Sequence, residues 1–64
     1  MKPDERLAEI KELIKFKLYH VADQKVDALY EDWTQGVIKL SEKQEWLMFM
    51  FIDQISNYLY LGME

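Results

Sequence analysis

Two pairs of glutamates have a spacing that could hold a metal ion. Glu9 and Glu12, and again Glu42 and Glu45, stand three residues apart, which places both carboxylates of a pair on one face of a helix. Helical Mg²⁺-binding proteins use such pairs, because hard cations need several converging oxygens. Here basic side chains surround the first pair. The second pair follows a helix-start signal at Ser41, where the helix dipole alone favours acids. We therefore expect no metal site.

His20 is the single histidine and the one candidate for acid–base catalysis. Asp23, three residues later, has the spacing to orient the imidazole, but a general base also needs a pocket and a second reacting group. The chain has no cysteine, and no serine stands near His20. Gly36 and Gly62 are too far apart to form a phosphate-binding loop. We expect no catalytic residue and no cofactor, and therefore a protein that is not an enzyme.

Acidic residues repeat every four positions along one segment. Asp23, Asp27 and Glu31 would form an acidic strip on one helix, with Asp32 beside it. The simplest interpretation is a solvated face. The functional alternative is a decoy that competes with nucleic acid for the basic pocket of a DNA- or RNA-binding protein. Direct nucleic-acid binding is not expected, because no basic residue follows Lys43.

The first half of the chain has the periodicity of a helix. Residues 4–35 contain no glycine or proline, and Gly36 is the first residue that readily ends a helix in the left-handed conformation. This pattern predicts one long helix over about residues 4–35. The alternative is a break near residues 20–23, where Asp23 would cap a second helix. Apolar residues recur at every third or fourth position: Leu7, Ile10, Ile14, Leu18, Ala22, Val26, Leu29 and Trp33.

The last helix has the clearest boundaries. Ser41 and Gln44 fit a capping box, in which the serine caps the backbone and the glutamine reaches back. Gly62 is placed to end the helix, so we predict a helix over about residues 42–61. One side carries a core stripe formed by Leu47, Phe51, Ile55 and Tyr58, flanked by Met48, Ile52 and Leu59.

The opposite side of the last helix is also apolar, and a helix that is apolar nearly all round is usually covered on more than one side. We predict that this side is a partner-binding or dimer face. Tryptophan and tyrosine around a few polar groups are typical of binding hot spots. The face comprises Trp46, Phe49, Met50, Asp53, Asn57 and Tyr60. A secondary patch is expected at Leu13, Phe16 and His20.

Size and composition complete the prediction. The 64 residues are half apolar, carry a formal net charge of −4 and fit one small helical domain over residues 1–64. No signal sequence and no apolar run long enough to span a membrane is present, so we expect a cytoplasmic protein with no membrane contact. So small a domain often gains stability by oligomerisation.

We therefore predict an all-α helical hairpin that pairs as a homodimer into a four-helix bundle. The alternative is a monomeric three-helix bundle broken near residues 20–23. The expected function is a protein–protein interaction module that regulates or inhibits a larger protein of unknown identity. The alternatives are the acidic decoy and a purely structural homo-oligomerisation module.

Overall fold

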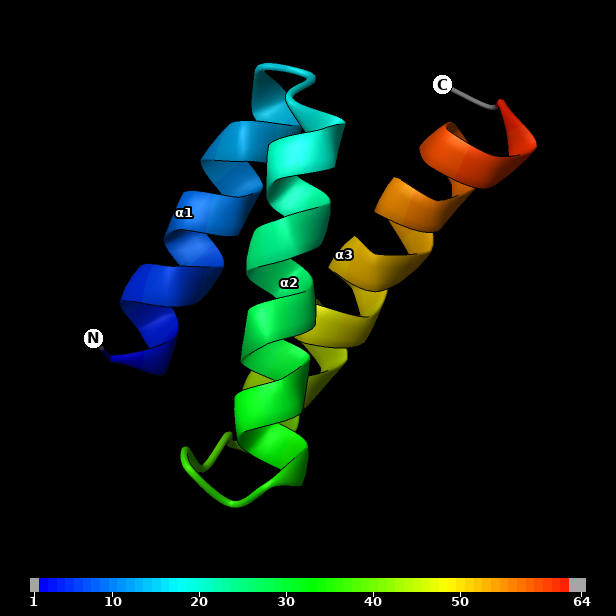
Figure 1. The fold of residues 1–64 in the computed structure, drawn as a ribbon. Coiled ribbons are helices and arrows are strands. Elements are labelled where there is room, and N and C mark those ends of the chain that lie inside the picture. Colours follow the sequence, from blue (N-terminus) through cyan, green and yellow to red (C-terminus); the bar gives the residue numbers. More distant parts are fainter. Residues whose placement is uncertain (1, 63–64) are drawn as a thin grey trace.

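The computed structural model describes residues 2–62 and contains three helices. They are α1 (Pro3–Lys15), α2 (Tyr19–Thr34) and α3 (Glu42–Leu61). Figure 1 shows α1 and α2 side by side in opposite directions, with α3 crossing them and its C-terminal end lying apart from the α1–α2 turn. The all-α prediction is confirmed, and within one chain the arrangement is the three-helix bundle rather than the hairpin.

The predicted long helix over residues 4–35 is wrong, because the chain reverses at Phe16–Leu18. The amide of Leu18 donates to the carbonyl of Leu13 at 2.8 Å, and the amide of Lys17 donates to the carbonyl of Ile14 at 2.9 Å. This pair of bonds is a Schellman motif, which needs a left-handed residue after the helix. Lys17 takes that conformation, with φ of 61°. The alternative prediction placed the break near residues 20–23, and the structure places it a few residues earlier.

The same motif ends α2, this time with the glycine that the sequence predicts. Gly36 has φ of 77°. Its amide donates to the carbonyl of Trp33, and the amide of Val37 donates to the carbonyl of Asp32 at 2.8 Å. After this turn the capping box starts α3 as expected. The amide of Gln44 donates to Ser41 Oγ at 3.2 Å, and the amide of Ser41 donates to Gln44 Oε1 at 2.8 Å.

A small apolar core joins the three helices. Most of the predicted stripe is buried, but Leu18 is 49% exposed because it lies in the turn between α1 and α2. At the end where α3 diverges, Tyr58 stacks on Tyr19 of α2 with ring centroids 3.9 Å apart. The buried residues are Leu7, Ile10, Ala22, Val26, Leu29, Met48, Phe51 and Ile55.

Three polar contacts fix the helices relative to one another. Arg6 of α1 donates to Asp32 of α2 at 2.7 Å. Lys25 Nζ lies 3.4 Å from Glu9 Oε1. Gln44, the residue that caps α3, also donates from Nε2 to Asp4 Oδ1 at 2.6 Å and so connects α3 to the first turn of α1. Among the helices of residues 2–62, none combines the length and hydropathy that a membrane span requires.

Candidate interaction face

The side of α3 that faces away from the core is left largely exposed by α1 and α2. We call it the outer α3 face, formed by Trp46, Phe49, Met50, Asp53, Asn57 and Tyr60. Its large apolar side chains are 63% exposed at Trp46, 46% at Phe49, 38% at Met50 and 73% at Tyr60. Asp53 is exposed and Asn57 half-buried. The three-helix packing therefore encloses only one of the two apolar sides of α3.

Phe49 connects the outer α3 face to α2. Its ring lies edge-on to Trp33, with centroids 5.7 Å apart, and to Tyr30 at 6.3 Å. Tyr30 and Trp33 also contact each other edge-on at 5.9 Å. Such edge-to-face pairs stabilise aromatic clusters beyond simple burial. Phe49 is thus held in place by α2, whereas no aromatic pairing of this kind joins Trp46 or Tyr60 to another ring of residues 2–62.

A pocket beside the outer α3 face lies between α1 and α3. It has a volume of about 280 Å³ and a mainly apolar lining. Met50 belongs to both the pocket and the outer α3 face, so the two surfaces are continuous. Ala8 is an exposed residue of α1 that lines the pocket, and its small side chain leaves the space open. The lining residues are Asp4, Leu7, Ala8, Lys11, Leu47, Met50 and Phe51.

This pocket was not predicted from the sequence. Ala8, a small residue that follows Leu7 at the edge of the apolar row of α1, is the sequence feature that belongs to it. The meaning of that residue depends on which helix lies opposite, and the expected long helix placed α1 differently. The pocket therefore became visible only with the packing of α1 on α3.

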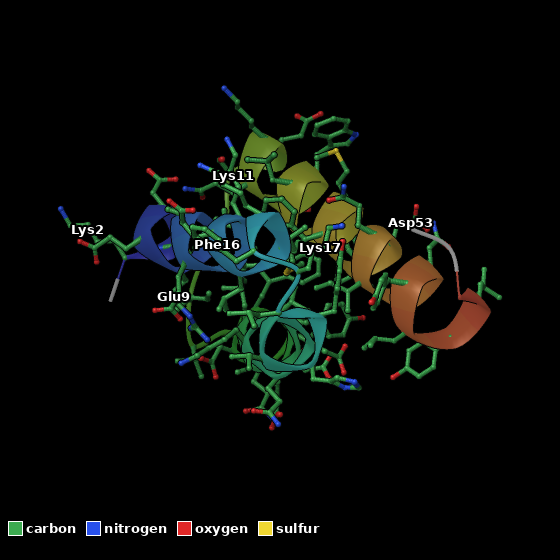
Figure 2. The ribbon with its side chains drawn as sticks, turned by 90° about the horizontal axis from the view of Figure 1, so that it is seen from above. Lys2, Glu9, Lys11, Phe16, Lys17 and Asp53 are labelled. Atoms are coloured by element: carbon green, nitrogen blue, oxygen red, sulfur yellow. The ribbon has the colours of Figure 1, made fainter. Side chains whose placement is uncertain are left out.

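Asp53 provides the negative charge of the outer α3 face. No Lys, Arg or His side chain of residues 2–62 lies within ion-pair distance of its carboxylate. Figure 2 shows Asp53 and Lys11 on the same side of the molecule, away from α2. Lys11 lines the pocket between α1 and α3. Met50, which also lines the pocket, precedes Asp53 by three residues, so Asp53 lies about one helical turn further along α3.

The secondary patch predicted at Leu13, Phe16 and His20 is divided by the turn. Leu13 packs against the core. Phe16 is 67% exposed in the turn, and His20 is exposed in the first turn of α2. Because the chain reverses between Phe16 and His20, these residues do not lie on one helix, which the predicted patch requires.

The acidic strip is present on α2, but Asp32 does not belong to it. Asp23, Asp27 and Glu31 follow one another at successive turns, whereas Asp32 points to α1 and pairs with Arg6. Burial, and second the charge of Asp23, raise the pKa of Asp27 above its ordinary value. Two carboxylates one turn apart on this helix thus repel each other.

The glutamate pairs of the sequence analysis do not meet in space. Within residues 2–62 no three His, Asp or Glu side chains converge in a way that could hold a metal ion. Glu9 instead faces Lys25, and Glu42 and Glu45 lie in the first turn of α3. Comparison with known proteins finds no similar one: the sequence matches no protein-family profile, no curated protein and no solved structure.

Proposed function

We propose that this chain is a cytoplasmic, non-enzymatic interaction module that regulates or inhibits a larger protein through the outer α3 face. One observation carries the proposal. The three helices form a common core and still leave Trp46, Phe49, Met50 and Tyr60 of a single helix face in contact with water. Large apolar side chains exposed together on one helix face are typical of protein-binding sites.

The side-chain types on this face suit protein recognition. Tryptophan and tyrosine bury a large area for few rotatable bonds, and they dominate the binding energy of protein interfaces. Methionine adapts its shape to a partner. Phe49, held by α2, loses little side-chain freedom on binding, which favours affinity.

Two other functions use different surfaces or partners. An acidic decoy would bind through Asp23, Asp27 and Glu31, and its affinity would fall steeply with salt. Apolar docking on α3 would change little with salt. In the third function, a second copy covers the outer α3 face. With three helices in each chain, that dimer would hold six helices rather than the four expected from the sequence.

Site-specific photo-crosslinking in the cells that make the protein tests the proposal. A benzophenone amino acid replaces Trp46 in one variant and Gln24, an exposed residue of α2, in a control. We expect a defined adduct with one larger protein from position 46 and none from position 24. The purified partner should then bind Trp46→Asp at least about thirtyfold more weakly than the original chain, as for a hot-spot residue. Adducts only between two copies, or none at all, would refute the regulator function.

A further inference from the structure

On α3, Asp53 lies about one helical turn beyond a residue that lines the pocket between α1 and α3. Met50 lines the pocket, and Asp53 follows it by three residues, or about 4.5 Å along the helix axis. Lys11, which lines the pocket, and Asp53 both lie on the side of the molecule that faces away from α2 (Figure 2). A single bound segment can therefore reach both at once.

The position of Asp53 argues against a second copy as the occupant. The outer α3 face extends from Trp46 to Tyr60, and Asp53 is its midpoint. In a parallel two-fold pairing, or an antiparallel one centred on the face, Asp53 meets the same residue of the other copy. Like charges placed opposite one another in an interface are repulsive. A shifted antiparallel pairing avoids this contact but leaves one aromatic end of the face uncovered.

The charges favour a partner that brings a cation. From Glu45 to Leu61, α3 carries only the two negative charges of Glu45 and Asp53. Neither carboxylate has an ion-pair partner among residues 2–62. Lys11 lines the pocket but forms no ion pair with Asp53, so a Lys or Arg on the partner would supply that pairing.

We propose that the partner of this module is an amphipathic helix of a different protein, bound along α3. It inserts one large apolar side chain into the pocket at Ala8 and Met50. A Lys or Arg three or four residues from that side chain faces Asp53. This inference rests on the proposed function and specifies the chemistry of the partner.

The dimensions agree with a helical ligand. Residues 46 to 60 cover roughly 21 Å of helix, the length of a partner helix of about four turns. Small-molecule sites usually measure about 300–1,000 Å³. At about 280 Å³ the pocket lies below that range and suits one large side chain. Helices that bind in this way present apolar residues at every third or fourth position.

A displayed library of 16-residue amphipathic helices is the probe. Four apolar positions at helical spacing are restricted to large side chains, and the remaining positions are randomised. We expect selection on the full chain to enrich Lys or Arg three or four residues from the anchor. A synthetic peptide from the selection should bind about three- to tenfold more tightly than the same peptide with Glu in place of that cation.

Two pairs of variants locate the binding. Ala8→Leu fills the pocket and should weaken the peptide about thirtyfold. Ala28→Leu is its control, because Ala28 lines a separate pocket between α1 and α2 and should have no effect. Asp53→Lys should reverse the preference, so that the Glu peptide binds better. Asp27→Asn removes a negative charge elsewhere and should leave the preference unchanged.

Several results would overturn the inference. They are a library with no binder, selected helices without the cation, equal binding to Ala8→Leu, and an unchanged preference in Asp53→Lys. Circular dichroism of each variant separates lost binding from lost folding. If crosslinking from position 46 still captures one larger protein, the proposed function stands and only the partner chemistry is wrong. If both experiments fail, neither proposal survives.

Discussion

Replacing Lys17 with glycine tests the reversal of the chain between α1 and α2. In the structure Lys17 has φ of 61°, a left-handed conformation that costs a residue with a Cβ atom about 1–2 kcal/mol. Glycine avoids this cost but loses about 0.4–1 kcal/mol more backbone entropy on folding. We therefore expect Lys17→Gly to stabilise the fold by about 0.5–1 kcal/mol.

Thermal unfolding followed by far-ultraviolet circular dichroism, at fixed protein concentration, measures the effect. For a domain of this size the gain corresponds to a rise in Tm of roughly 2–8 °C. Lys17→Ala is the first control, because it removes the charge but keeps the Cβ atom, and its Tm should change little. Lys11→Gly, in the interior of α1, should lose about 1 kcal/mol.

A single helix over residues 4–35 predicts that Lys17→Gly lowers the stability instead of raising it. If residues 4–35 formed one helix, position 17 would be a helix interior, and Lys17→Gly would cost about as much as Lys11→Gly. A Tm of Lys17→Gly below that of the original chain would therefore refute the three-helix structure.

Further predictions concern the core, the face and the charges. Phe51→Ala should lower the free energy of unfolding by about 3–5 kcal/mol and so leave the chain unfolded, which a urea titration measures. By contrast, Trp46→Asp should keep its helical circular dichroism and its midpoint, and an unfolded variant would make Trp46 a core residue. A double-mutant cycle on Arg6 and Asp32, which pair at 2.7 Å, should give a coupling of about 1 kcal/mol, and zero coupling would contradict the contact. Folding raises the pKa of Asp27, so the folded state binds more protons there, and this contribution to stability decreases as pH rises above 3.8. Asp27→Asn should therefore be the more stable variant at neutral pH, with the difference vanishing at pH below 3.8 in paired thermal melts.

The contrast between Gly36 and Lys17 explains how far the sequence predicted the fold. Both residues occupy the same left-handed position of a Schellman motif. Glycine is the usual residue there, so the end of α2 was predicted. Lysine carries no such signal, and Leu18, the N-cap of α2, has no capping side chain. The hydrogen bonds of the turn, rather than a residue preference, end α1.

Hydrophobic periodicity did not reveal the break either. Ile14, Leu18 and Ala22 continue the spacing of four residues across the turn, yet Leu18 is half exposed. The turn occupies about one helical turn of sequence, so the apolar pattern of α2 resumes in phase with that of α1. Spacing alone cannot distinguish a continuous helix from two helices joined in this way.

The candidate site was predicted in part. Within α3, the periodicity separated the core stripe from the outer α3 face, because both belong to one helix whose bounds the sequence predicted. The pocket depends on α1 meeting α3, a contact between residues about forty positions apart. A pattern read along one helix contains no information on such a contact, so Ala8 could not be recognised as part of the site.

Gln44 couples the first turn of α1 to the first turn of α3. Its side-chain oxygen accepts from Ser41, and its nitrogen donates to Asp4 at 2.6 Å. Helix ends usually fray independently, but here the opening of either start breaks the hydrogen bond that joins the two. Asp4 also borders the pocket, so this hydrogen bond joins the capping box of α3 to one edge of the pocket. A glutamate, equally suited to a capping box, would repel Asp4 and uncouple the two ends.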